Sequence, residues 1–495
     1  MSDSNGDRPP TFAWSGPLNA ETVPENLPRL LNRFLESYLP RQRWYGEKGH
    51  IVSNIEVDTP DVVERADAFI TLSVAHLTFE SGNSYRYFVP FVIEHGESEE
   101  TIVRLDAEGE IWSLISSSTS EEFHRWLWEG VQGAAGTERF RWHLNSDQFR
   151  NLAKPLSRML SGEQSNTNIA FGNEALIKIF RRVQPGLNPD VELGNFLTAE
   201  AGLSSVPGVL ADLRMILPGG QEASIGIAQS FLAGSQDGWT WLNEQLVAAG
   251  NDIDRRSAIQ IAIRDLGRVT ATVHLALAEA HDPEIEPQPI TDIDIDRWRS
   301  QTTSAVKTIL SRVASKLPTI EHEQARVQAE ALINYGERLL ASLAGYDLLL
   351  GLNKTRVHGD YHLGQTLHRG DGWFVIDFEG EPARPLAERR ARYSPLKDVA
   401  GMLRSLGYAR AFATQADNAW TDPARTLERV FLAGYRTGVY ASPLASSIYP
   451  MSEEAFASTL RPWIIDKAIY EIAYELDNRP SWLWVPIMSL FAGDE

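Results

Sequence analysis

The hydrophobic pattern of the chain changes its period near residue 240, and this change constrains the fold more than any other feature. Before it, β-branched and aromatic residues dominate 68–79 and 85–92, and Ser81–Ser84 separates these runs with turn-forming residues. We therefore expect a long hairpin there. A further β segment is expected over 156–180.

After residue 240, apolar residues recur at helical spacing in runs such as 259–280 and 321–343. One hairpin is expected to interrupt these helices near 357–378. The pattern predicts an α+β protein with a β-rich N-terminal half and a mainly helical C-terminal half. Two lobes with a cleft between them follow as an expectation.

The charge balance excludes two classes of partner. Acidic residues outnumber basic ones 66 to 46, which gives a formal net charge of −20. Such a field repels phosphate backbones and anionic lipid, so we expect neither nucleic acid nor a membrane as partner. The first 20 residues lack the apolar core of a signal peptide. A cytoplasmic protein that acts on a small molecule is expected.

Several reaction types are excluded by missing residues. The chain has no cysteine, which removes disulfides, thiolate zinc sites and Cys nucleophiles. It also lacks the Walker A sequence, the Gly-x-Gly-x-x-Gly fingerprint, His-Glu-x-x-His and Gly-x-Ser-x-Gly. P-loop and Rossmann nucleotide sites, zincins and serine hydrolases are therefore unsupported.

The segments 357–365 and 373–379 carry the sharpest chemical signal. An Asp-Gly pair at 371–372 favours a tight turn between them, which would bring Asp360 and Gln365 towards Asp377. Two carboxylates and an amide suit phosphoryl transfer, in which one carboxylate accepts a hydroxyl proton and the other groups hold Mg²⁺. Either aspartate alone would be read as part of a loop network; together, at this spacing, they favour catalysis.

These segments resemble the catalytic loop and metal-binding segment of the aminoglycoside-phosphotransferase-like kinases, relatives of the protein kinases. The resemblance implies a bilobal protein-kinase-like fold with ATP and Mg²⁺. It places Asp360 on the catalytic base and Asp377 on the metal-binding aspartate. Gln365 falls where the superfamily usually has an asparagine.

A kinase-like chain should hold a lysine on a strand of its nucleotide lobe. Lys178 lies in the apolar run 175–180, where it is either an edge-strand solubiliser or a phosphate ligand. Asn188 and Pro189 predict a helix start that places Glu192 within reach of Lys178. The polar loop 162–168 is expected to cover phosphates, with Ser165, Asn166 and Thr167 as nucleotide ligands. The run 227–232, with Gln229 and Phe231, is read equally as the adenine hinge or as a plain buried strand.

A narrower resemblance, to bacterial maltokinases, is carried by 379–390, 394–404 and 162–187. It spans about 39–486. With it we divide the chain into a flexible start at 1–24, a cap at 25–100, a nucleotide lobe at 101–232 and a helical lobe at 233–495.

A C-terminal helix is predicted over 463–476. Ile465, Ile469, Ile472 and Leu476 share its apolar face, whereas Lys467, Tyr470, Glu471 and Tyr474 lie opposite. That second face suits a sugar site, although a solvated helix face is the plainer interpretation. The maltokinase resemblance makes Lys467, Glu471 and Tyr474 sugar ligands, and we add Tyr470, His362 and Glu379. His274 is expected to be a hydrogen-bonded core histidine, and Asp398 to brace the catalytic loop through His358.

The resemblance to maltokinases thus implies an ATP-dependent kinase that phosphorylates the anomeric hydroxyl of maltose to maltose 1-phosphate, in glycogen and trehalose metabolism. The alternative on the same scaffold is a kinase of glucosamine or another amino sugar. A sensor without turnover is the alternative outside the enzymes, and only Gln365 favours it. A monomer or weak homodimer is expected.

Overall fold

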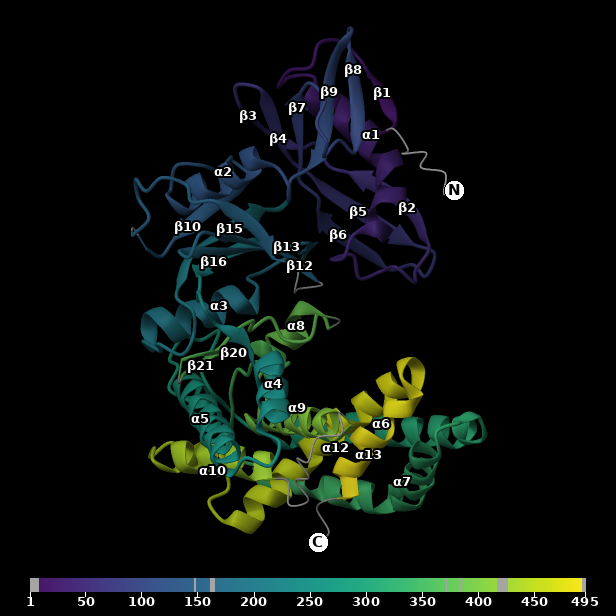
Figure 1. Cartoon of the computed structure of the whole chain (residues 1–495), viewed down its shortest axis with the longest axis vertical. Coiled ribbons are helices and arrows are strands. Elements are labelled where there is room, and N and C mark those ends of the chain that lie inside the picture. Colours follow the sequence, from purple (N-terminus) through teal and green to yellow (C-terminus); the bar gives the residue numbers. More distant parts are fainter. Residues whose placement is uncertain are drawn as a thin grey trace. The chain divides into compact units, whose positions relative to one another are not determined.

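A computed structural model describes residues 9–146, 148–160, 165–370, 372–382, 384–415 and 426–491 (Figure 1). The chain divides into two compact units. The first unit is Met1–Asn195 with Gly208–Ala233, and the second is Phe196–Pro207 with Gly234–Glu495. The predicted boundaries at residues 24, 100 and 232 stay predictions.

The first unit contains three sheets. The first has the order β1-β8-β9-β7-β4-β3, in which β1 runs parallel to β8. The helix α1 (Val23–Tyr38) buries Leu27, Leu31 and Leu35 in the same apolar cluster as residues of this sheet. The strands are β1 (Thr11–Trp14), β3 (Asp61–Glu64), β4 (Ala68–Leu72), β7 (Phe91–His95), β8 (Val103–Ala107) and β9 (Glu110–Ser116).

The predicted long hairpin is present, but it is divided between two sheets. Its distal part, β5 (Val74–Phe79) with β6 (Ser84–Phe88), joins β2 (Val52–Val57) and β14 (Arg182–Val183) in a second sheet. Its proximal part is the pair β4–β7 of the first sheet. The change of sheet falls at Ser73 and at Val89, which is followed by Pro90, a residue that has no N–H for a ladder bond.

The third sheet carries the predicted nucleotide residues. Its order is β10-β15-β16-β13-β12-β11, and the pairs described between these strands are antiparallel. The expected β segment at 156–180 thus forms three of its strands. The strands are β10 (Phe140–Leu144), β11 (Ser157–Leu160), β12 (Asn166–Phe171), β13 (Ala175–Phe180), β15 (Val209–Ile216) and β16 (Glu222–Ser230). Part of the predicted phosphate loop, 162–164, lies outside the described residues.

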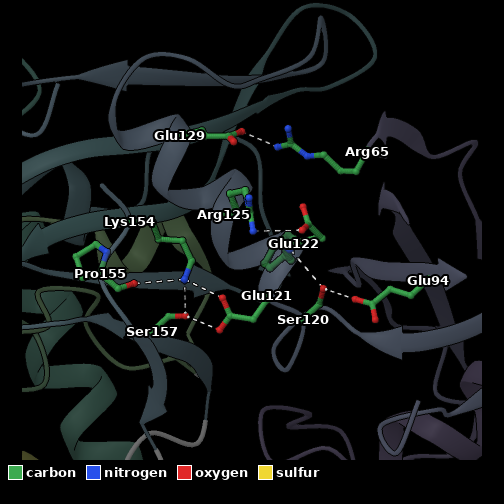
Figure 2. Close-up of polar contacts among 11 residues, drawn as sticks. Arg65, Glu94, Ser120, Glu121, Glu122, Arg125, Glu129, Lys154, Pro155 and Ser157 are labelled. Atoms are coloured by element: carbon green, nitrogen blue, oxygen red, sulfur yellow. Dashed lines mark hydrogen bonds and ion pairs between the residues drawn. The ribbon is translucent and has the colours of Figure 1, made fainter. Parts of the chain in front are cut away.

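The helix α2 (Glu121–Val131) joins the first and third sheets through polar contacts (Figure 2). Ser120, its N-cap, donates to Glu94 on β7 at 3.1 Å. Glu121 accepts from Lys154 at 2.8 Å and from Ser157 on β11 at 3.3 Å. Further along, Glu129 accepts from Arg65 at 2.6 Å. One face of the helix is buried between the sheets, so these contacts lie at the rim of a shared core.

The second unit is mainly helical, as predicted. Its long helices are α4 (Gly238–Ala249), α5 (Ile253–Ala278), α6 (Asp292–Lys316), α7 (Glu323–Ser342), α9 (Leu396–Gln415), α10 (Thr426–Tyr440) and α12 (Glu453–Asn478). Shorter ones are α8 (Leu386–Arg389), α11 (Ala445–Ile448) and α13 (Trp484–Phe491). None of the helices in the described ranges combines the length and the hydropathy that a bilayer span requires.

Helices α5 and α10 lie side by side (Figure 1) because glycine lets their backbones meet. A Cβ at Gly267 would lie 2.2 Å from the Phe431 carbonyl oxygen, and one at Gly434 would lie 1.9 Å from that of Arg264. No side chain fits at such distances. The close packing fixes α5, which carries His274 close to the loop 358–362 through their shared contact with Asp398.

The predicted hairpin in the helical half is also present, with shorter strands than expected. It consists of β20 (Thr366–Arg369) and β21 (Gly372–Val375), preceded by the short 3₁₀ helix η5 (Leu363–Gln365). Asp371, half of the predicted turn, lies outside the described residues. The α+β architecture, with a β-rich first part and a helical second part, is therefore confirmed.

Candidate active site

The loop 358–362 is held by a buried carboxylate that accepts hydrogen bonds from its backbone. Asp398, in the first turn of α9, accepts from the backbone N–H groups of His358 at 2.7 Å and Gly359 at 2.9 Å. Its Oδ2 also lies 3.3 Å from His274 Nε2, and His274 Nδ1 lies 2.8 Å from the Tyr435 hydroxyl. Asp398 therefore braces the loop through backbone donors, and His274 is a hydrogen-bonded core histidine.

The brace shifts the acidity of Asp398. Complete burial would raise the pKa of its carboxyl group, but the His274 hydrogen bond, nearby positive charge and the Gly359 N–H outweigh that effect and lower the pKa. The carboxylate therefore stays ionised at neutral pH and keeps its acceptors for the loop.

Asp360 lies at the tip of this loop. Lys467 Nζ on α12 donates to its Oδ1 at 3.3 Å, and His362 Nε2 lies 3.9 Å from its Oδ2. Both side chains of the Asp360–Lys467 pair are partly exposed, at 20% and 27%. Two residues predicted independently, from a loop motif and from a helix face, are thus in direct contact.

Burial and nearby charges shift the pKa values of Lys467 and His362, the two neighbours of Asp360. Burial tends to lower the pKa of Lys467, but the Asp360, Glu471 and Glu381 charges outweigh it and raise the pKa, so Lys467 stays cationic. Burial lowers the pKa of His362. Since His362 Nδ1 accepts from the Gly364 N–H at 3.1 Å, the neutral ring carries its proton on Nε2, the atom nearer Asp360.

Asp377 follows β21 in a left-handed backbone conformation, with φ of 66°. Aspartate tolerates this region better than most residues, and such outliers concentrate at functional sites. The Ile376 N–H donates to the Gln365 carbonyl at 3.1 Å, so the backbone of Gln365 pairs with the residue directly before Asp377 at the base of the hairpin.

The donors around Asp377 fit a magnesium ion. Ligand oxygens of Asp377 and Glu379 lie within 4.8 Å of one another, and hard oxygen donors of this kind suit Mg²⁺. Glu379 was predicted as a sugar ligand. The structure instead places it beside Asp377, where Arg389 Nη1 donates to its backbone carbonyl at 2.9 Å.

A cavity of about 400 Å³ opens beside Asp360 within the second unit. We call it the Asp360 cavity. Its volume falls in the range of about 300–1,000 Å³ that is usual for small-molecule sites. Its lining comes from α6, α9, α12, the catalytic loop and the segment before α8: Ser304, Ala305, Thr308, Ile309, Gly359, Asp360, Tyr361, Glu381, Arg384, Lys397, Asp398, Gly401, Trp463, Asp466, Lys467, Ile469, Tyr470 and Ala473.

The predicted sugar face of α12 is only partly on this cavity. Lys467 and Tyr470 line it, whereas Glu471 and Tyr474 are not among its lining residues. Glu471 accepts from the buried Arg404 of α9 at 2.8 Å, and the Arg479 guanidinium lies 5.6 Å from the centre of the Tyr474 ring. The apolar face of the helix is as predicted, since Ile465, Ile469, Ile472 and Leu476 are all buried.

In the first unit, Lys178 forms a buried ion pair. Its Nζ donates to Asp190 Oδ2 at 2.9 Å, and the two side chains are 6% and 0% exposed. Asp190 lies in α3 (Pro189–Asn195), whose start is as predicted: the Asn188 side chain accepts from the Asp190 N–H at 2.9 Å. The carboxylate described against Lys178 is thus Asp190, two residues before the expected Glu192, which is also buried.

Strand register separates the predicted phosphate ligands. Asn168 on β12 lies opposite Lys178 on β13, so their side chains share a face. Thr167 is on the other face, where its hydroxyl accepts from the buried Arg181 at 2.9 Å. Successive strand residues alternate in direction, so Thr167 lies on the face opposite Lys178. Its assignment as a nucleotide ligand stays a prediction. Asn166 does share the Lys178 face, and its amide donates to Ser165 at 3.3 Å.

The expected adenine hinge is the end of β16. Gln229 pairs with Leu176 on β13, two positions from Lys178 and on the same face. The Phe231 N–H donates to the Glu174 carbonyl at 3.1 Å, and Arg158 lies 5.5 Å from the centre of its ring. The sheet thus brings Asn166, Lys178 and Gln229 together on one face.

Sequence reasoning missed four residues near these sites: Asp190, Asn168, Lys397 and Asp466. Counting two residues on from Asn166 would have found Asn168. Asp466 directly precedes Lys467, and Lys397 directly precedes Asp398. Neither carries a sequence signal of its own that would distinguish it from a solvated helix residue.

Comparison with known proteins agrees with this site. The region 157–430, more than half of the chain, matches the phosphotransferase enzyme family (APH). A glucosamine kinase of Mycolicibacterium smegmatis is 27% identical over 341 residues, which cover 67% of this chain and 78% of the relative. One of Streptacidiphilus jiangxiensis is 26% identical over 336 residues, or 66% and 71%.

A solved glucosamine kinase in complex with glucosamine, ADP and inorganic phosphate superposes with a TM-score of 0.66 at 20% identity, covering 94% of this chain and 98% of that one. This likeness confirms the kinase-like fold. The segment that matches the family includes Lys178, Asp190, Asp360, Asp377 and Asp398. The chain therefore belongs to the phosphotransferase enzyme family.

Proposed function

We propose that this protein is an ATP-dependent kinase of an amino sugar, with glucosamine as the favoured acceptor. Asp360 acts as the catalytic base, and the Asp360 cavity binds the sugar. The proposal assigns nucleotide binding to the Lys178 face of the first unit.

One observation carries the proposal. The candidate base lines a cavity of small-molecule size and is in contact with a lysine from the predicted sugar helix, at 3.3 Å. A base with no room beside it for an acceptor would support a purely structural role. Instead, a mainly apolar cavity with a few charged groups lies beside the carboxylate that is to receive the proton.

The proposed chemistry follows from the charges. Asp360 accepts the proton of the attacking sugar hydroxyl and orients its oxygen. Lys467, cationic at neutral pH, donates to the Asp360 carboxylate and offers its other N–H donors to the sugar. Neutral His362 presents its Nε2–H on the other side of the same carboxylate.

Magnesium would supply charge neutralisation on the phosphate oxygens. Asp377 and Glu379 would hold it, with Gln365 offering an amide carbonyl in place of the usual asparagine. The left-handed backbone at Asp377 fixes that carboxylate relative to the hairpin base.

The names of the relatives favour the amino sugar over maltose. The maltokinase-like segments 379–390 and 394–404 support maltose as the second candidate. The two candidates differ in charge, because glucosamine carries an ammonium group and maltose does not.

Initial rates of ATP consumption with glucosamine, N-acetylglucosamine, glucose and maltose test the proposal. We expect the highest kcat/KM for glucosamine. A higher kcat/KM for maltose would make maltose the acceptor and would leave the assignment as a sugar kinase unchanged. No sugar-dependent consumption with any of them would remove the proposed function.

A further inference from the structure

Most charged side chains around the Asp360 cavity already have a partner. Asp360 is paired with Lys467. Glu381 is paired with Arg384, which also contacts Glu388 at 3.2 Å. These groups are therefore neutralised before any ligand binds.

Two lining residues differ from that pattern. The described residues show no ion pair to Asp466; its Oδ1 accepts only a long hydrogen bond, 3.3 Å, from Thr302 Oγ1. Lys397 likewise has no ion pair within the described ranges, and its Nζ lies 3.9 Å from the centre of the Tyr393 ring. The two charges line one cavity without touching each other.

Without a ligand, the partial burial of Lys397 and Asp466 costs free energy, because neither charge has an ion-pair partner among the described residues to offset its desolvation. Burial lowers the pKa of Lys397 despite the opposing charge of Asp466, so the pair does not compensate its own desolvation. A carboxylate held partly away from water gains most from a cation placed directly against it. Asp466 also precedes Lys467 on α12, so it lies on the wall of the cavity next to the catalytic pair.

We propose that Asp466 is the specificity-determining carboxylate of this site: it binds the ammonium group of an amino-sugar acceptor, while Lys397 donates to a neighbouring sugar hydroxyl. The inference rests on the proposed function and deepens it. It explains how one cavity would prefer a cationic sugar over a neutral one, because a neutral hydroxyl gives Asp466 a hydrogen bond but no opposite charge.

The test is the variant Asp466→Asn, which keeps the size of the side chain and removes its charge. The specificity ratio, kcat/KM for glucosamine divided by kcat/KM for glucose, should fall at least tenfold, mainly through the KM for glucosamine. Asp477→Asn is the matched control: Asp477 lies on the same helix but is exposed, pairs with Arg312 and Lys316, and should leave the ratio unchanged.

A binding measurement separates this inference from the proposed function. Calorimetric titration of glucosamine and glucose into the full chain requires no turnover. If the wild-type protein binds glucosamine and Asp466→Asn binds it tenfold more weakly, the inference stands even if no phosphate is transferred. An equal loss for glucosamine and glucose, or an unchanged ratio, would overturn it.

Misfolding of the asparagine variant would not remove the test. Asp466→Glu retains the charge and is checked by its thermal midpoint against the wild-type protein. It should keep a preference for glucosamine over glucose although both KM values rise. A glutamate variant that folds but has lost the preference would contradict the assignment.

Discussion

Each unit of the protein contains a lysine–aspartate pair, and the two pairs differ in burial. Lys178 and Asp190 in the first unit are 2.9 Å apart and almost fully enclosed, with side chains 6% and 0% exposed. Lys467 and Asp360 in the second unit are 3.3 Å apart and border a cavity, with side chains 27% and 20% exposed. The same two residue types thus occur in a closed and an open setting.

The difference in burial determines how much stability is lost when one partner of the pair is removed. In the closed pair, neither charge can reach water if its partner is removed, so loss of one partner destabilises the fold. In the open pair, water and substrate can replace the partner, so the contact itself contributes little to stability. We expect substitutions in the closed pair to lower stability in addition to weakening nucleotide binding, and those in the open pair to change turnover with little loss of stability.

The largest effect is expected for Asp360→Asn. The variant should lose on the order of 10²–10⁴-fold in kcat, because the acceptor for the hydroxyl proton is gone. Nucleotide affinity, measured by titration with ATP, should change little. Turnover within tenfold of the wild-type value would remove Asp360 from the role of base.

Lys178→Met should lower the free energy of unfolding by about 3–5 kcal/mol, since it leaves Asp190 charged and buried. Urea denaturation measures this loss. The double variant Lys178→Met/Asp190→Asn should recover part of it, because the stranded charge is removed as well. If Lys178→Met alone lowered the free energy of unfolding by less than about 1 kcal/mol, the Lys178–Asp190 pair would behave as a solvent-screened pair and not as a buried one.

Asp398→Asn should cost about 1–3 kcal/mol, as one of the buried N–H groups of His358 and Gly359 loses its charged acceptor. The folded-state pKa of Asp398 is lowered, so its contribution is present above the unfolded carboxyl pKa and is lost as pH falls through the folded value. Unfolding measured over a pH series should therefore show the gap between wild type and variant narrowing towards acid. A gap that widens there would contradict the lowered pKa.

The smallest change in stability is expected for Lys467→Met, below about 1 kcal/mol, because the open pair is solvent-screened. The KM for the sugar should nevertheless rise on the order of tenfold, with a smaller effect on the KM for ATP. Comparison with Lys178→Met uses the same substitution in both settings. Equal destabilisation by the two would break the distinction between them.

Features set by local periodicity could be predicted from the sequence. The buried stripe of Ile465, Ile469 and Ile472 on α12 follows from helical spacing alone, and the backbone pairing of Gln365 with Ile376 follows from one hairpin. The start of α3 after Asn188 follows from its capping residue.

Features set by distant segments could not be predicted. Glu471 forms a hydrogen bond with Arg404, which lies 67 residues earlier in the chain. The hairpin at 68–92 divides between two sheets because the pairing partners of each half come from elsewhere. The face on which Thr167 lies relative to Lys178 could not be predicted either, since the strand register that sets it needs the partner strand to be known.

In the proposed function, the phosphoryl group passes from ATP to an amino sugar while Asp360 of the open pair accepts the proton of the sugar hydroxyl. The most direct measurement is a ³¹P NMR spectrum of the wild-type protein with ATP, Mg²⁺ and glucosamine, recorded beside the same mixture with Asp360→Asn. We predict a phosphomonoester resonance coupled to sugar protons in the first sample and none in the second. A spectrum in which ATP yields only inorganic phosphate, or an ester that forms equally well in the variant, would contradict the account.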